Sequence, residues 1–375
     1  MADRVQEIVT ELPGMTSVTD VCAAADRSLA GGDAAFVADL GIALARARGS
    51  GTGRIWQYRC VFDHLLRLLA TTPGPGHVAQ ALRLVPSAEN AGRKLDRHAA
   101  SLLASSHPTG ELTVAFSGKA SEELRACLVH ELVLRGVDVT AIPRIARWAT
   151  SPHWSHHPLR WLPLALADVE GQPDLPSYSA RGSIYSMPYG PSGKRGGAVV
   201  AGARVPSVEE TTTDTVADGI GAAVANWAEE SNGRIEARVF ELADPLEGEA
   251  VPSLLAALGL ECLKGEGKKT GFLAEVCPPD QVWRVLFAAA STGGAYNSGA
   301  CGAYGRLAAW RSLAGLCGAA EGDPAEAVEA RAGACTWYGF SADTKWFEQV
   351  AWDVGLAAIS PERRRVAVLA ATDTD

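Results

Sequence analysis

The stretch "RIEARVFEL" (residues 234–242) decides the fold class, because apolar and charged residues alternate along it. Ile235, Ala237 and Val239 face one side of an extended chain and charged residues face the other, which is typical of a half-buried β-strand. Two later runs are also strand-like, "ACTWYGF" (residues 334–340) and "RRVAVLAA" (residues 364–371). The second half of the chain therefore contains β-structure.

Helical patterns separate these strands, since apolar residues there recur at steps of three and four. In the last of them Asp343 would cap the helix, and Trp346, Phe347, Val350 and Val354 would share one face. Strands mixed with helices predict an α+β or α/β domain over residues 201–375. The helices are expected at about 250–258, 280–290, 301–317 and 343–358.

Residues 1–150 show helical periodicity only, interrupted by Gly, Pro and Ser. The segment "SEELRACLVHELVLRG" is representative: Ser121 suits the N-cap and Gly136 the C-terminal cap of a helix. Successive helices with short connections predict a hairpin stack or a solenoid-like array. The fold class is thus α+β, a helical amino-terminal array followed by a mixed α/β carboxyl-terminal domain.

Residues 151–200 differ from both halves, being rich in Pro, Ser, Gly and aromatic residues. This composition predicts a connecting segment between a helical domain (1–150) and the mixed domain (201–375). Ordered crossing loops are the alternative, because Trp154, Trp161 and Tyr178 are too apolar for a plain linker.

Charge and composition restrict the function classes. The net charge is −9, and residues 201–375 carry 14 Lys+Arg against 25 Asp+Glu, which disfavours nucleic-acid binding. The chain has no apolar run of about 18 residues, so no membrane span is expected. The charged start at Met1–Leu12 and eight scattered cysteines favour a cytoplasmic protein with buried thiols, without a disulfide framework.

The stretch "STGGAYNSGACGAYGRLAAWRSLAGL" (residues 291–316) holds six glycines ahead of and within a helical pattern. Two interpretations are open: tight packing of the helix, or a ligand pocket lined by Tyr296, Asn297, Tyr304 and Arg306. In the second, Arg306 would bind a carboxylate or phosphate in bidentate fashion. The glycine spacing matches neither dinucleotide-binding nor phosphate-binding loops, so no cofactor is predicted.

Two further groups of residues are candidates for chemistry. Asp373 and Asp375 follow a predicted strand, where they would either assist a ligand site or belong to a solvated tail. His153, His156 and His157 are weak metal candidates, since a site would need further ligands that no nearby motif supplies. Surface or aromatic-packed histidines are the alternative, and no metal is predicted.

Most of the sequence resembles a known group of proteins, and the resemblance is densest in the last hundred residues. The segments "FAAASTGGAYNSGACGAYGRLAAWRSLAGL" and "WFEQVAWDVGLAAISPERRRVAVLAATDTD" look like those of an uncharacterised bacterial family from GC-rich genomes, a domain of unknown function. "LRACLVHELVLRGVDV" and "HPLRWLPLALADVEG" resemble it more loosely. The resemblance implies no established activity, so no catalytic residue is carried over.

Two function hypotheses follow from the sequence. The first is a non-catalytic binding or scaffold protein, because no nucleophile, cofactor or metal pattern is recognisable. The second is a small-molecule enzyme or ligand-binding protein with its pocket at the 291–306 loop, aided by Asp373. The expected partners are a protein or a small molecule, with neither nucleic acid nor membrane, and a homo-oligomer is left open.

Overall fold

The predicted strand at residues 234–242 is strand β4 (Arg234–Leu242) of an antiparallel sheet in the computed structural model of the chain. The structure describes residues 2–50, 56–88, 92–118, 120–185, 204–264, 271–347 and 352–373. These residues form two compact units, the first comprising residues 1–160 and 175–185, and the second residues 161–174 and 186–375. The segment predicted to connect two domains thus contributes to both units, and residues 186–200 of it lie outside the described part.

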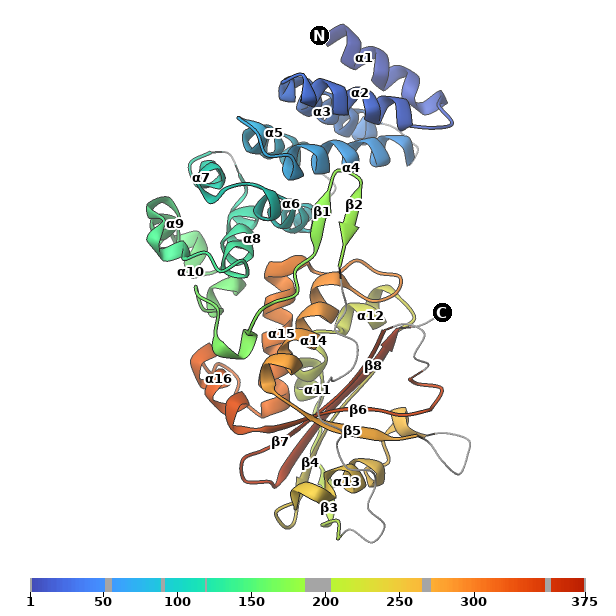
Figure 1. The fold of residues 1–375 in the computed structure, drawn as a ribbon, viewed down its shortest axis with the longest axis vertical. Helices are drawn as coiled ribbons and strands as arrows, with labels where there is room; N and C mark the ends of the chain where they lie inside the picture. The colour runs from blue at the N-terminus through green and yellow to red at the C-terminus, as the bar shows by residue number, and fades with distance from the viewer. Residues whose placement is uncertain are drawn as a thin grey trace. The chain divides into compact units, whose positions relative to one another are not determined.

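The first unit is the predicted helical array (Figure 1). Its helices pack against the next helix, or the next but one, along the chain. Leu, Val and Ala side chains form apolar stripes on these helices and are buried. A short hairpin, β1 (Ser177–Ser179) and β2 (Gly182–Ile184), also belongs to this unit and lies against two of its helices. The helices are α1 (Ala2–Glu11), α2 (Thr19–Ala30), α3 (Ala34–Ser50), α4 (Trp56–Thr71), α5 (His77–Leu84), α6 (Gly92–Ser106), α7 (Thr109–Leu112), α8 (Glu122–Val133), α9 (Pro143–Trp148) and α10 (Pro152–Ser155).

The second unit is built on a six-stranded sheet whose neighbouring strands are all antiparallel, in the order β3-β4-β8-β7-β6-β5. The central strands β7 and β8 are buried over most of their length, whereas β3 is exposed at one edge. With the helical first unit, this sheet makes the chain an α+β protein. Besides β4, the strands are β3 (Val208–Glu210), β5 (Leu273–Cys277), β6 (Thr336–Ser341), β7 (Trp352–Ile359) and β8 (Arg365–Asp373).

Helices and loops cover both faces of this sheet. One face packs against α11 (Asp214–Gly221), α14 (Pro279–Thr292) and α15 (Cys301–Cys317). The other face packs against α13 (Val251–Ala257), where Phe240, Val368 and Leu254 belong to one apolar cluster. The remaining helices of the unit are α12 (Ala225–Glu230) and α16 (Ala325–Ala334). Figure 1 shows α14 and α15 side by side next to the sheet.

The helix expected at 343–358 is wrong, because residues 352–359 form strand β7 in the middle of the sheet. A strand buried on both faces shows a continuous apolar run rather than alternation, and such a run resembles a helix in sequence. Trp346 and Phe347 belong to the apolar cluster under the sheet instead of a helix face. Val350, assigned to the same face, lies outside the described residues.

No helix in the described part of the chain is both long enough and apolar enough to cross a bilayer.

Candidate functional site

The glycine-rich loop between α14 and α15 is fixed by the side chain of Asn297. The Gly294 N–H donates to Asn297 Oδ1 at 2.9 Å. Asn226, on α12, donates to the same oxygen at 3.1 Å and accepts from Asn297 Nδ2 through its backbone carbonyl at 3.2 Å. Every polar atom of this amide is therefore used to hold the loop in its turn and against α12.

Asp373 fixes the same loop from the sheet. It is the last residue of β8 and is fully buried. Its Oδ1 accepts from Ser231 Oγ at 2.7 Å, and its Oδ2 accepts from the Ala295 N–H at 2.7 Å. A Cβ at Gly294 would lie 2.0 Å from Asp373 Oδ2. The glycine therefore allows the close approach that brings Ala295 onto the carboxylate.

Arg306 lies on α15 and pairs with Glu170, both side chains being fully buried. The guanidinium donates from Nε to Glu170 Oε1 at 2.6 Å and from Nη2 to Oε2 at 2.6 Å. It also donates to the carbonyls of Pro163 and Ala165, each at 2.9 Å. The carboxylate accepts a further bond from Trp310 Nε1 at 2.9 Å. The bidentate contact expected for a ligand is thus made to Glu170 of the same unit.

The structure brings only some of the predicted site residues together. Asn297 and Asp373 accept from two successive backbone N–H groups of one loop, whereas the partners of Arg306 lie in residues 163–170. Tyr296 projects from the loop with 60% of its surface exposed, and Tyr304 is half-buried on α15. Asp375 lies outside the described residues. Ligand binding by this set stays a prediction.

The glycines of α15 and the loop before it allow close packing. A Cβ at Gly305 would lie 2.6 Å from Ser291 Cβ on α14, and one at Gly299 would lie 2.2 Å from the Ser291 carbonyl oxygen. Further along α15, a Cβ at Gly315 would lie 2.9 Å from a side-chain carbon of Ile220 on α11. These separations are possible only without a side chain, so the glycines bring three elements into contact.

The opposite face of the sheet carries a second polar group at the same end. Arg234 on β4 pairs in register with Thr372 on β8, and Thr372 pairs with Asp353 on β7. By strand alternation these three share the face that packs on α13. The Arg234 guanidinium lies 4.6 Å from the centre of the Trp346 ring. Within the described part of the chain, Thr372 Oγ1 and Trp346 Nε1 are buried without hydrogen-bond partners.

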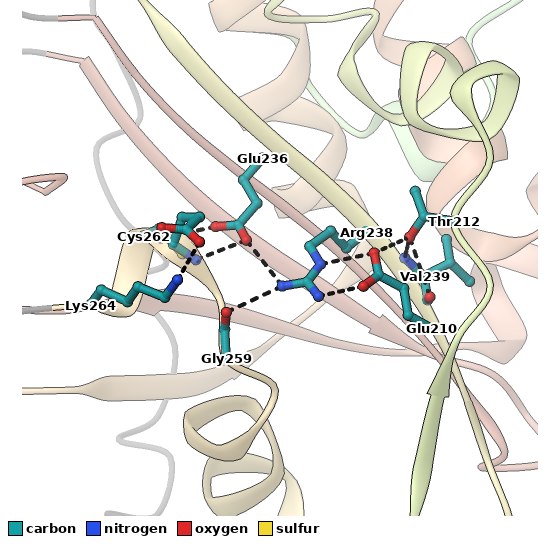
Figure 2. A network of polar contacts seen from close by, with 9 residues as sticks. Glu210, Thr212, Glu236, Arg238, Val239, Gly259, Cys262 and Lys264 are labelled. Carbon is teal, nitrogen blue, oxygen red and sulfur yellow. Dashed lines mark hydrogen bonds and ion pairs between the residues drawn. The ribbon is translucent and has the colours of Figure 1, made fainter.

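A third polar network lies on β3 and β4 and was not predicted (Figure 2). Arg238 donates to Glu210 and Glu236, and Glu236 accepts from the backbone N–H groups of Glu261 and Cys262 at 2.9 Å each. The hydrogen bond from Arg238 lowers the pKa of the Glu210 carboxyl. In the sequence, the only sign of this network is the charged pair Glu236 and Arg238 at alternate positions of a strand. Their partners lie more than 20 residues away, so the sequence pattern does not identify them.

The three candidate histidines lie at or just after α10 in the first unit. His157 Nε2 lies 3.1 Å from Glu123 Oε2, and its Nδ1 accepts from the Leu159 N–H at 3.2 Å. The ring stacks on Trp154 with its centre 6.2 Å away. His156 Nδ1 lies 2.8 Å from the Pro152 carbonyl oxygen. Among the described residues, no group of three or more His, Cys, Asp or Glu side chains is placed to hold a metal ion.

Fold and polar networks together define an α+β protein with a helical array and a separate unit built on an antiparallel sheet. The chain belongs to a family of unknown function, DUF6183, whose model matches residues 19–375. No curated protein and no solved structure matches it.

Proposed function

We propose that the chain is a non-catalytic binding or scaffold protein of the cytoplasm. The observation that carries this proposal is that the polar side chains in and around the glycine-rich segment form hydrogen bonds and an ion pair with other parts of the chain. Arg306 is fully bonded to Glu170 and two carbonyls, and Asp373 and Asn297 are bonded to the loop and its neighbours. Side chains that stabilise a fold in this way are not poised for chemistry.

The cysteines support the same proposal. Burial raises the pKa of the Cys277 thiol to about 12 and that of Cys335 to about 11. Burial also raises the pKa of Cys262 and Cys317. These thiols are protonated at neutral pH and are poor nucleophiles. None of the eight cysteines, which all lie in the described residues, forms a disulfide, and this suits a reducing compartment.

Affinity capture of the full chain tests the proposal, combined with light scattering of the purified protein. We expect a partner to co-purify at a fixed ratio under native conditions, or a defined assembly of the chain with itself. A monodisperse single chain that retains no partner at low salt would count against a scaffold.

Small-molecule binding at the carboxyl end of β8 is the second candidate function. The alternative pocket at the 291–306 loop lies at this end, with Tyr296 exposed. The specific observation in its favour is on the other face, where buried Thr372 Oγ1 and Trp346 Nε1 lack partners in the described residues. A ligand offering hydrogen-bond acceptors would satisfy such groups.

A thermal-shift screen of small polar compounds tests this second candidate. A compound that stabilises the chain should lose its effect in Trp346→Phe, which removes the indole N–H, or in Tyr296→Ala, which removes the exposed ring. Equal stabilisation of both variants and the parent chain would exclude this end of the sheet as the binding site.

A further inference from the structure

In the first unit the β1–β2 hairpin lies next to α4 and α6 (Figure 1), and polar side chains from these elements form a cluster. Tyr178 of β1 places its hydroxyl 2.9 Å from Ser101 Oγ on α6. The Tyr178 ring stands edge-on to His98, also on α6, with ring centres 6.3 Å apart and an angle of 81°. The hairpin therefore brings hydroxyl groups and an imidazole together over the surface of α6.

Arg67 on α4 provides the positive charge of this cluster. A Cβ at Gly182 of β2 would lie 3.8 Å from Arg67 Nη1, so the guanidinium reaches under the hairpin. Its Nε is buried and has no hydrogen-bond partner in the described part of the chain. No carboxylate of the described residues lies within ion-pair distance of Arg67. Asp63, one turn earlier on α4, is instead 3.8 Å from Arg59.

The pKa of the His98 imidazole is changed by these surroundings. Burial, together with the charge of Arg67, lowers the pKa of the His98 imidazole to about 4. The ring is therefore neutral at physiological pH and forms no hydrogen bond within the described residues. A partly buried guanidinium beside a neutral imidazole, with no carboxylate of the described residues within ion-pair distance, is an unfavourable arrangement unless an anion joins it.

We propose that Arg67, His98, Ser101 and Tyr178 form a binding site for an oxyanion, the carboxylate or phosphate group of a small molecule. The guanidinium supplies a planar pair of donors matched to two oxygens of such a group. Because the Ser101 and Tyr178 hydroxyls are hydrogen-bonded to each other, one of the two can donate to the anion, and the imidazole donates from one ring nitrogen. The hairpin limits access of water, which strengthens each of these contacts.

The charged groups around the cluster are consistent with an anion. Asp63 lies on the same helix as Arg67 outside ion-pair distance; burial raises the pKa of its carboxyl, and the charges of Arg59, Arg67 and Arg48 lower it, so three guanidinium groups surround a single carboxylate. Arg48 of α3 adds positive potential near Asp63. Arg135 of α8 donates to the Ser101 carbonyl at 3.5 Å and pairs with Glu131 at 2.7 Å. The charge of Glu131 is thus balanced by that of Arg135.

Titration of His98 in the full chain by NMR tests the proposal, with the His98 resonance assigned by its loss in His98→Gln. The probes are inorganic phosphate and acetate, each compared with chloride at equal ionic strength. We expect at least one probe to raise the His98 pKa, because the bound anion offsets the charge of Arg67. The more effective probe shows whether the site prefers phosphate or carboxylate. A pKa that neither probe moves beyond the chloride control would overturn the proposal.

Two variants identify the residues responsible. Arg67→Gln should weaken binding of the effective probe by about tenfold or more, since the charged donor pair is lost. Arg59→Gln is the matched control on the same helix, because Arg59 is exposed and faces Asp63, and it should bind as the parent chain does. Equal binding by both variants would contradict the site. If Arg67→Gln does not fold, Tyr178→Phe provides the test, and its unchanged affinity would contradict the assignment of the hydroxyl.

Discussion

At the scale of single residues, removing one charge from the buried Arg306–Glu170 pair should lower the free energy of unfolding more than removing one charge from an exposed pair. We expect Glu170→Gln to lower the free energy of unfolding by about 3–5 kcal/mol, because it leaves the guanidinium buried without its counter-charge. Asp174→Asn is the control, since the Asp174–Arg284 pair is more than one-third exposed on both sides and should contribute less than about 1 kcal/mol. Urea denaturation measures both variants, and similar losses would contradict the ranking.

His98 should make stability depend on pH. Its pKa is about 4 in the folded chain and 6.5 ordinarily, so protons bind the unfolded chain preferentially between these values. The free energy of unfolding therefore decreases as pH falls from 6.5 towards 4, by up to about 1.4 kcal/mol per pH unit from this residue. Urea titrations at several pH values should show a smaller decrease for His98→Gln. Parallel pH profiles for the variant and the parent chain would refute this.

Sequence reasoning selected several polar residues at this scale but could not assign their partners. Asn297 and Asp373 were identified as candidates, and the side chains of both accept hydrogen bonds from the backbone of the same loop. Arg306 was also identified, but Glu170 lies 136 residues away and no local pattern connects the two. Composition and spacing reveal which side chains are unusual, whereas the fold determines whether each one binds a ligand or another part of the chain.

At the scale of elements, the contact between α14 and α15 depends on a glycine. Gly305→Ala should destabilise the chain by about 1–3 kcal/mol, because the new Cβ would overlap the backbone and side chain of Ser291. Gly333→Ala in α16 is the matched control, since nothing lies within 4 Å of its added Cβ. It should be neutral or stabilising by up to about 1 kcal/mol. Thermal unfolding compares the two, and equal effects would contradict tight packing at Gly305.

Elements were predictable where their apolar residues recur at the period of a strand or a helix. The strand at 234–242 alternates because one side of it carries Glu236 and Arg238, and its predicted bounds agree with β4. The helix at 301–317 was likewise recognised with the bounds of α15. Strand β7 was missed because it is buried on both faces. Its Gly355 is informative only in the structure, where a Cβ would lie 2.1 Å from the Phe340 carbonyl oxygen.

At the scale of the whole molecule, the division into two units predicts that a destabilising substitution in one unit increases local unfolding in that unit only. Glu170→Gln should increase amide hydrogen exchange in α15 and in residues 161–174, all within the second unit. Exchange in α3 and α4 of the first unit should be unchanged. Mass spectrometry of the exchanged, digested chain gives both values. Equal increases in the two units would show that they unfold together.

The central claim for the whole molecule is that its polar residues stabilise two units that act by binding, without a resident cofactor. Native mass spectrometry of the chain, purified without added metal or ligand and exchanged into volatile buffer, tests this most directly against its denatured mass. We expect the mass of an assembly of two or more copies of the polypeptide, or of the polypeptide together with a protein partner. A reproducible excess from a metal or organic group that is lost on denaturation would contradict it.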